Sequence, residues 1–356
     1  MSAALAPRTR FALPAELSAT QPPEARGLRR DEVRLLVAEG STVWHARFRD
    51  LGRFLAAGDV VVVNTSGTLA AAVDTAGPVA VDPAGPAAGP VVHFSTPLDS
   101  PGEWVAELRR PDQSGPIRDA RPGSRIALPG GGSLTLLDHM GDSDRLWRVR
   151  VEVPGTVPAY LNRYGRPISY SYLRGRWPLS AYQTVFANEP GSAEMPSAGR
   201  PFTHELVAAL VSAGVTVAPI TLHTGVSSLE SGEPPQPERF RVPASTAGLV
   251  NLARANGGRV VAVGTTVARA LETVALPDGS VRAGAGWTDL VLGPDRPARV
   301  VDGLITGLHE PEASHLLLLE AIAGPALVQR TYDAAIEGRY LWHEFGDSCL
   351  LLPARG

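Results

Sequence analysis

Lysine is absent from this chain of 356 residues, so all 33 residues counted as Lys or Arg are arginines. Without lysine, the chain has no side-chain amine for Schiff-base chemistry, no phosphate-binding lysine of a P-loop and no strand lysine of a protein kinase. Its one cysteine, Cys349, excludes a disulfide framework and a metal site built from several cysteines. The sequence also lacks a nucleophile-elbow motif and a glycine-rich dinucleotide-binding turn.

Long apolar runs are missing as well. The longest one, residues 316–328, is interrupted by Glu320 and by a Gly-Pro pair, whereas a membrane-spanning helix needs about 18 uninterrupted apolar residues. The N-terminal segment carries Arg8 and Arg10 where a secretory signal requires a continuous apolar stretch. The net charge is −3, so any nucleic acid must meet a local basic patch. We therefore expect a cytoplasmic protein that does not bind membranes.

Residues 72–153 consist of short alternating segments between turns rich in glycine and proline. The segments with the composition of strands are residues 90–94, 104–108, 125–128, 133–137 and 146–153. This spacing, without helical periods, predicts a small antiparallel barrel or sandwich. Residues 77–90 have the low-complexity composition of a loop within it.

The flanking parts of the chain alternate between helical and strand patterns. Strands are predicted at residues 33–37, 60–63, 215–220, 259–263, 290–292, 300–305 and 349–352, and helices at 203–212, 244–256, 264–273, 315–324 and 326–337. Hydrophobic strands that alternate with helices predict an open α/β sheet. We therefore expect a discontinuous α/β domain, residues 1–71 and 154–356, interrupted by a β-barrel of residues 72–153.

One candidate ligand site begins at Gly264, directly after a predicted buried strand. The hydroxyl groups of Thr265 and Thr266 and the free N–H groups of a helix N-terminus can hold oxygen atoms of a ligand. Arg269 and Glu272 follow one turn apart, so they can share a helix face. The alternative is an ordinary strand–turn–helix junction with a surface ion pair.

Two histidines, His223 and His309, each follow a predicted strand, a position typical of pocket residues in α/β sheets. The alternative is a structural role for both. A zinc site is not expected, because no His-x-x-x-His pair or cysteine cluster accompanies them.

Residues 160–177 combine four arginines with four tyrosines and Trp177. Arginines interleaved with aromatic residues suit phosphate contact and base stacking. The alternative is a solvated loop whose aromatic side chains cover a domain junction.

The most informative segment is residues 182–202, a long stretch without hydrophobic periodicity between patterned segments. Such connections are usually functional. Residues 182–187 read YQTVFA, 196–199 PSAG, 221–225 TLHTG, 264–272 GTTVARALE and 346–347 GD. In this order, these motifs resemble the S-adenosylmethionine:tRNA ribosyltransferase-isomerase family of queuosine biosynthesis, over nearly the whole chain.

The resemblance implies a three-layer α/β domain with an inserted closed β-barrel, consistent with the architecture expected above. It also implies that S-adenosylmethionine is the ribosyl donor. The acceptor is the aminomethyl group of 7-aminomethyl-7-deazaguanine in tRNA, and the products are epoxyqueuosine, adenine and methionine. This chemistry needs a base beside the sulfonium and a hydrogen-bonded cradle for the leaving adenine. No metal is implied.

By the resemblance, His223 and Glu238 are the candidate acid/base pair. The candidate ligand-binding residues, which hold S-adenosylmethionine or line its pocket, are Gly264, Thr265, Thr266, Arg269, Tyr182, Gln183, Ser197 and His309. The expected partner is tRNA. The oligomeric state is left open by the sequence, with a monomer favoured.

Several family motif positions carry other residues in this chain. Pro201 and Gln236 stand where the family has histidines, and Gly307 stands where it has asparagine. Each such change removes a polar group from the expected site. Two alternatives therefore stay open: a divergent paralogue that uses the same donor on a small-molecule acceptor, and a non-catalytic relative that binds nucleotides or RNA.

Overall fold

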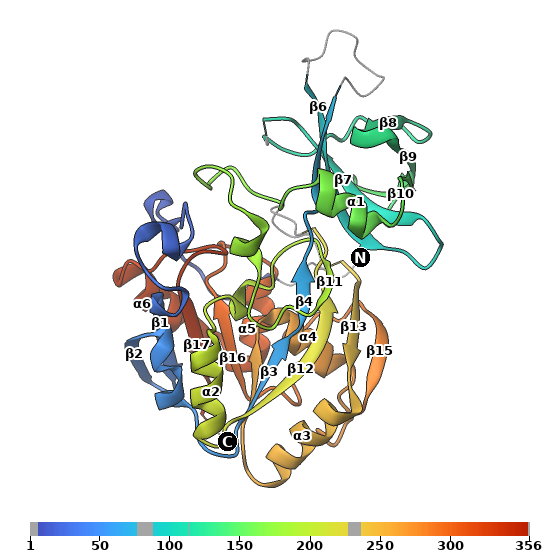
Figure 1. Cartoon of the computed structure of the whole chain (residues 1–356). Coiled ribbons are helices and arrows are strands. Elements are labelled where there is room, and N and C mark those ends of the chain that lie inside the picture. The colour runs from blue at the N-terminus through green and yellow to red at the C-terminus, as the bar shows by residue number, and fades with distance from the viewer. Residues whose placement is uncertain (1–5, 77–87, 113, 227–235, 355–356) are drawn as a thin grey trace.

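The computed structural model describes residues 6–76, 88–112, 114–226 and 236–354. In these residues, a nine-stranded mixed sheet forms the centre of the larger domain (Figure 1). Its strands are, in spatial order, β15 (Gly284–Thr288), β13 (Glu238–Val242), β12 (Thr216–His223), β3 (Val60–Asn64), β14 (Val260–Val263), β16 (Gly303–Gly307), β17 (Ser348–Leu352), β1 (Arg34–Glu39) and β2 (Thr42–Arg47). The four strands β12, β3, β14 and β16 are mutually parallel, so their carboxyl ends lie at one edge.

Helices cover both faces of this sheet, because the central strands are apolar on both sides. Val60 and Val62 of β3 pack in one hydrophobic cluster, and Val61 and Val63 pack in the opposite one. The first face is covered by α3 (Ala244–Ala255), α4 (Thr265–Thr273), α5 (His315–Ala323) and α6 (Pro325–Glu337). The second face is covered by α2 (His204–Ser212) and the 3₁₀ helix Phe48–Phe54. The result is three layers.

A second, antiparallel sheet of six strands lies within the described residues. Its order is β5 (Ala72–Ala76), β6 (Ala88–Pro97), β7 (Glu103–Arg109), β10 (Leu146–Glu152), β9 (Gly132–His139) and β8 (Arg125–Leu128). The end strands β5 and β8 lie next to each other, so the sheet curls into a nearly closed barrel. Its apolar core also includes Tyr160 and Leu161 of helix α1 (Val157–Tyr164).

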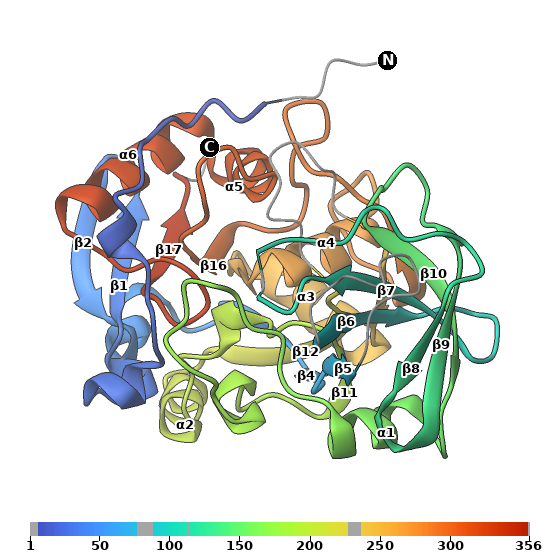
Figure 2. The same cartoon turned by 90° about the horizontal axis from the view of Figure 1, so that it is seen from above.

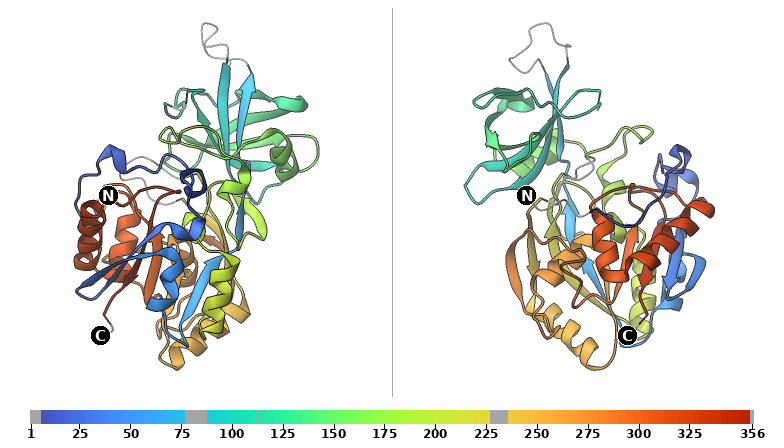
Figure 3. Two further views of the ribbon diagram at one scale, coloured as in Figure 1. Left: turned by 60° about the vertical axis from the view of Figure 1, so that its left-hand side comes forward. Right: turned by 180° about the vertical axis from the view of Figure 1, so that it is seen from behind.

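The barrel projects from the end of the α/β domain at which the parallel strands terminate (Figures 1 and 3). Seen from above, it lies on the side opposite β1 and β2 (Figure 2). One attachment is a short parallel pair, β4 (Ser66–Thr68) and β11 (Glu189–Ser192). This arrangement places the barrel beside the carboxyl edge of the main sheet.

The predicted fold class, an α/β domain with an inserted antiparallel barrel, is confirmed by these two sheets. The domain boundaries at residues 72 and 153 stay a prediction. Most predicted elements are present within a few residues. The strand predicted at 290–292 is wrong, and the one predicted at 300–305 begins only at Gly303. Of the loop predicted at 77–90, residues 77–87 lie outside the described residues, whereas residues 88–90 begin β6.

Helix ends follow the expected local chemistry. The Thr203 side chain accepts a hydrogen bond from the Leu206 N–H, 3.1 Å away, and so caps α2. Helix α6 begins at Pro325 itself, one residue earlier than predicted, because proline is well suited to the first position of a helix. None of the helices in the described residues is long and apolar enough to cross a membrane.

Asp59 joins the starts of β3 and β14, which are the two central strands. Its carboxylate accepts hydrogen bonds from the backbone N–H groups of Ala56 (2.9 Å) and Arg259 (2.8 Å). It also accepts from Nε (3.0 Å) and Nη2 (2.7 Å) of the Arg259 guanidinium. Burial alone would raise the pKa of Asp59, but the hydrogen bonds and charge of Arg259 outweigh it, and the pKa is lowered.

We therefore predict that Asp59→Asn lowers the free energy of unfolding by about 2–3 kcal/mol, since it leaves a largely buried guanidinium without its carboxylate. Urea denaturation at neutral pH measures the change. Glu39→Gln is the matched control, because Glu39 lies 3.8 Å from the same guanidinium and its side chain is 48% exposed. Equal effects of the two substitutions would contradict the role assigned to Asp59.

Candidate functional site

The carboxyl ends of four parallel strands meet at the edge of the main sheet that faces the barrel. Asn64 ends β3, His223 ends β12, Gly264 follows β14 and Gly307 ends β16. Ligands of α/β proteins bind at this edge, because loops and helix N-termini converge there. The structure thus brings His223 and Gly264, which are far apart in sequence, to one edge.

Asn64 connects the strand ends with one side chain. Its Oδ1 accepts hydrogen bonds from the N–H groups of Leu222 and Ser66, both at 3.0 Å. Its Nδ2 donates to the Leu222 carbonyl (2.8 Å) and to Oγ1 of Thr266 (3.4 Å). The side chain is buried, so all four bonds form away from water. Asn64 therefore fixes β12 and the first turn of α4 relative to β3.

His223 lies at the end of a chain of hydroxyl groups. Its Nδ1 is 2.7 Å from Oγ of Ser66, which is itself 2.6 Å from Oγ of Ser192. Ser192 Oγ accepts a hydrogen bond from the Thr224 N–H at 3.0 Å. Burial lowers the pKa of His223, so the imidazole is neutral at pH 7 and can exchange a proton with a neighbour.

Glu238 begins β13, the strand that pairs with β12. Its Oε1 accepts a hydrogen bond from the Gly225 N–H at 3.1 Å, and its Oε2 pairs with the Arg269 guanidinium. Burial raises the pKa of Glu238, although the charge of Arg269 opposes the shift. His223 and Glu238 lie on neighbouring strands, but each is hydrogen-bonded to its own partners.

Arg269 is 6% exposed, and its guanidinium is bound within the fold. Besides Glu238, it donates to the backbone carbonyls of Leu290 (3.1 Å), Gln236 (3.2 Å) and Thr288 (3.1 Å). Arg269 therefore holds the carboxylate of Glu238 in place and joins α4 to the two outer strands. The alternative of a surface ion pair between Arg269 and Glu272 is wrong, because Glu272 is buried and accepts hydrogen bonds from the backbone of residues 299–301.

The turn that begins α4 is tightly packed. Gly264 has φ 91°, a conformation that other residues rarely adopt. A Cβ atom there would lie 3.3 Å from Cβ of Ala198. The turn therefore packs tightly against the segment that contains Ser197, while Thr265 and Thr266 start the helix.

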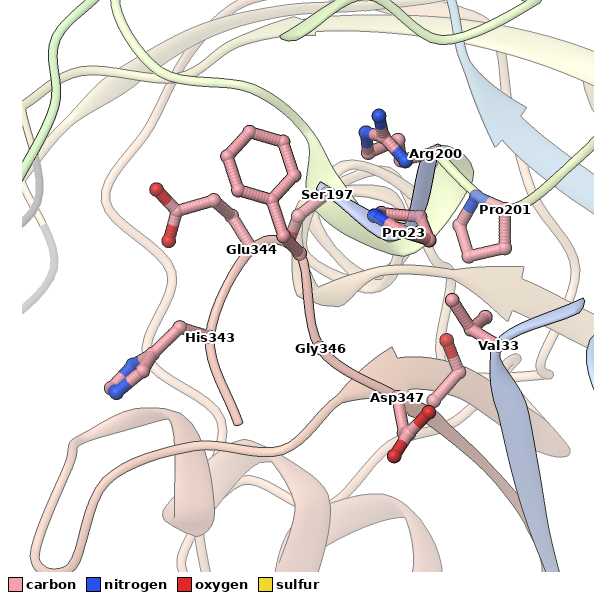
Figure 4. A pocket seen from close by; sticks show the side chains of 11 residues that line it. Pro23, Val33, Ser197, Arg200, Pro201, His343, Glu344, Gly346 and Asp347 are labelled. Carbon is pink, nitrogen blue, oxygen red and sulfur yellow. The ribbon is translucent and has the colours of Figure 1, made fainter. Parts of the chain in front are cut away.

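The other candidate residues surround this edge. Gln183 is held by both ends of its amide, with Oε1 3.0 Å from the Thr68 N–H and Nε2 2.8 Å from the Thr68 carbonyl. Ser197 lines a small cavity together with Arg200, Phe345 and Asp347 (Figure 4). Pro201, which stands at a family histidine position, lines the same cavity.

His309 lies after β16 in an apolar environment. Its Nε2 is 3.0 Å from Oγ1 of Thr306, and its ring stacks on His315 with centroids 4.6 Å apart. Burial lowers the pKa of His309 well below its usual range. Its backbone N–H donates to the Tyr332 hydroxyl at 3.1 Å. His309 is thus a neutral, packed residue of the edge. The described residues contain no group of three or more His, Cys, Asp or Glu side chains suited to a metal ion.

Residues 160–177, the segment rich in arginine and tyrosine, lie at the junction between the two domains. This position favours the interpretation of the segment as a loop whose aromatic side chains cover that junction. Arg166 and Arg176 pair with Asp74 of the barrel. The hydroxyls of Tyr170 and Tyr172 donate to Glu194 and Glu344. The two tyrosine hydroxyls are therefore hydrogen-bonded within the protein.

Sequence analysis missed several polar residues of the edge, which are Ser66, Ser192, Glu194 and Glu344. No periodicity or motif marks them, since Ser66 and Ser192 lie in the very short strands β4 and β11, and Glu194 and Glu344 lie in loops. The only available signal was position. Ser66 follows a predicted strand, and Glu344 lies two residues before Gly346 of the matched Gly-Asp motif.

Known proteins are similar to this chain over almost its full length. The family model described as queuosine biosynthesis protein matches residues 8–351. The S-adenosylmethionine:tRNA ribosyltransferase-isomerase of Symbiobacterium thermophilum is 35% identical, with 96% of this chain and 98% of the relative covered. The protein of the same name from Thermus thermophilus is 36% identical, with coverages of 91% and 93%. The crystal structure of the S-adenosylmethionine tRNA ribosyltransferase from Thermotoga maritima is 27% identical, with a TM-score of 0.52 and coverages of 96% and 99%.

The position of the His223 ring depends on the absence of a side chain at Gly191, because a Cβ there would clash with the imidazole. We predict that Gly191→Ala displaces the ring from Ser66 towards solvent and raises the pKa of His223 towards about 6.5. NMR titration of the histidine resonances measures the shift. Gly248→Ala is the control, since a Cβ at Gly248 meets nothing within 4 Å. An unchanged His223 titration in Gly191→Ala would contradict this packing.

Proposed function

We propose that this chain, which belongs to the queuosine biosynthesis protein family, is an S-adenosylmethionine:tRNA ribosyltransferase-isomerase. The family match spans residues 8–351, and relatives of that name are 35–36% identical over more than nine-tenths of the chain. The reaction transfers and isomerises the ribosyl group of S-adenosylmethionine onto 7-aminomethyl-7-deazaguanine in tRNA. The products are epoxyqueuosine, adenine and methionine.

The observation that carries the proposal is the meeting of His223, Glu238 and the first turn of α4 at one edge of the sheet. The reaction requires a base that removes a proton beside the sulfonium. Glu238 suits this role because burial raises its pKa, which makes the carboxylate a stronger base. Arg269 and the Gly225 N–H hold that carboxylate in one orientation.

The remaining polar groups of the edge suit the two ends of the donor. The N-terminus of α4, with Thr265 and Thr266, is suited to the carboxylate of the methionyl group. His223 is neutral and hydrogen-bonded to Ser66. It can therefore donate a hydrogen bond to adenine as adenine leaves the ribose. Tyr182, Gln183, Ser197 and His309 line the surrounding pocket in this proposal.

The partner in this proposal is tRNA, and the reaction takes place in the cytoplasm, where tRNA is present. Both candidate acid/base residues and the α4 turn come from one chain, so the proposed reaction needs no second copy of it.

The direct experiment incubates the protein with S-adenosylmethionine labelled in adenine, with and without tRNA that carries the aminomethyl deazaguanine. We expect adenine release only with this tRNA. Release with a small-molecule amine but not with tRNA would replace the proposal by a divergent transferase. Binding of the donor without adenine release would indicate a non-catalytic relative, and no binding would contradict the assignment altogether.

We predict that His223→Ala and Glu238→Gln each lower kcat by about 100-fold or more, the usual contribution of a general acid or base. Adenine release under saturating substrates measures the effect. Glu16→Gln is the control for the Glu-to-Gln change, because the Glu16 side chain is 59% exposed on the surface. If neither site variant slows turnover, the assignment of the two residues is wrong.

The pH profile provides a separate prediction for Glu238. A general base must be unprotonated, so kcat/KM should fall as the pH decreases through its pKa. Because burial raises that pKa, we expect the midpoint to lie above the usual glutamate value of about 4.3. A rate profile from pH 4 to pH 8, recorded as adenine release, measures it. A flat profile over the range of about pH 4–8 would show that Glu238 is not the base.

A further inference from the structure

A row of stacked aromatic rings lies beside the candidate site. The ring centroids of Tyr170 and Tyr172 are 6.0 Å apart, and Tyr172 lies 4.0 Å from the His343 ring at an interplanar angle of 15°. Each tyrosine hydroxyl donates a hydrogen bond to a carboxylate, Tyr170 to Glu194 and Tyr172 to Glu344. Each of the two carboxylates is therefore held by one tyrosine of the aromatic row. We name these four residues, Tyr170, Tyr172, Glu194 and Glu344, the Tyr/Glu pocket.

This pocket is connected to the candidate acid/base residues. The backbone carbonyl of Glu194 accepts a hydrogen bond from Oγ1 of Thr224 at 2.6 Å, and Thr224 directly follows His223. The negative charge of Glu194 contributes to raising the pKa of both Glu238 and Glu344. The Tyr/Glu pocket and Glu238 are thus within electrostatic range of each other.

Glu344 has no positively charged partner among the described residues. Among the residues that the structure describes, its carboxylate forms no ion pair with an arginine or histidine, and it is bonded to the Tyr172 hydroxyl. Burial raises the pKa of Glu344 to about 7. The side chains of His343 and Glu344 point to the same side of their loop, away from Asp347 (Figure 4). A carboxylate in such a place is stabilised when a cationic ligand enters.

A second observation also indicates a ligand here. The Tyr182 side chain is 3% exposed, and its hydroxyl has no hydrogen-bond partner among the described residues. Burial, and then the negative charge of Glu344, raise the pKa of this hydroxyl. Its ring packs against Phe345, the residue after Glu344, with centroids 5.1 Å apart. An unpaired buried hydroxyl is costly, so a polar ligand beside Glu344 would satisfy it.

We propose that the Tyr/Glu pocket binds the protonated primary amine of the acceptor; this inference rests on the proposed function. An ammonium group has three N–H donors, which suit two carboxylates. A sulfonium has no N–H donor, so the carboxylates favour the acceptor amine over the sulfur of the donor. Glu194 and Glu344 thereby favour an acceptor base with an aminomethyl group over one with an uncharged substituent.

The test compares two tRNAs that differ only at the modified base. One carries the deazaguanine with its aminomethyl group, and the other carries the same base with an uncharged nitrile. We expect Glu344→Gln and Glu194→Gln each to weaken binding of the aminomethyl tRNA by about tenfold or more, the loss of a charge-assisted hydrogen bond. Binding of the nitrile tRNA and of S-adenosylmethionine should not change.

Two further variants keep the comparison interpretable. Tyr172→Phe retains the stacked ring but removes the hydroxyl that orients Glu344, so it should cause a smaller loss of the same selectivity. Glu152→Gln on the barrel is the matched control, because its side chain is 60% exposed. Thermal melts of all variants, measured by circular dichroism, identify any variant that fails to fold.

The outcomes separate this inference from the proposed function. If the wild type releases adenine with the aminomethyl tRNA, but both glutamine variants keep the wild-type preference for the amine, the pocket assignment is wrong. Weaker binding of S-adenosylmethionine alone would place the ammonium of the donor in the pocket and likewise overturn it. If the wild type releases no adenine, the proposed function fails, and the affinities for the two tRNAs still decide whether the pocket selects an amine.

Discussion

The candidate site depends on the buried ion pair between Arg269 and Glu238. Arg269 also donates to three backbone carbonyls that belong to β15, to its following loop and to the residues before β13. The same guanidinium therefore holds the carboxylate of the candidate base and joins α4 to the outer part of the main sheet. Because a buried charge without a partner is strongly destabilising, neither residue can change alone without disturbing both the chemistry and the local fold.

Much of the architecture follows from the sequence because its patterns are local. The apolar run at residues 60–63 alternates between two clusters, and Thr203 caps its helix with its own side chain. The outer strands β13 and β15 were missed for a physical reason. β15 has the sequence GAGWT and β13 alternates arginines with buried residues, so their pairing depends on neighbours and on Arg269 instead of on intrinsic propensity.

The candidate site was only partly predictable. Gly264, Thr265 and His223 follow strands, so position in an α/β sheet identifies them. Ser66, Glu194 and Glu344 act through contacts between segments that are far apart in sequence, and no local pattern encodes such contacts. For Arg269, a motif is present but does not reveal the contacts. The motif indicated a ligand-binding residue, and the structure shows its guanidinium bonded to Glu238 and to three backbone carbonyls. Burial and hydrogen-bond partners, which only the structure provides, distinguish the two roles.

The pairing of β4 with β11 is one of several contacts that join the barrel to the α/β domain. The Val226 N–H also donates a hydrogen bond to Oγ of Ser95 in β6, at 2.9 Å. The Tyr172 hydroxyl donates to Glu344, so the segment that follows the barrel is bonded to the loop before β17. A ligand that contacts both residues would therefore bind two segments that are far apart in sequence, and its affinity would depend on how firmly the two segments are held together.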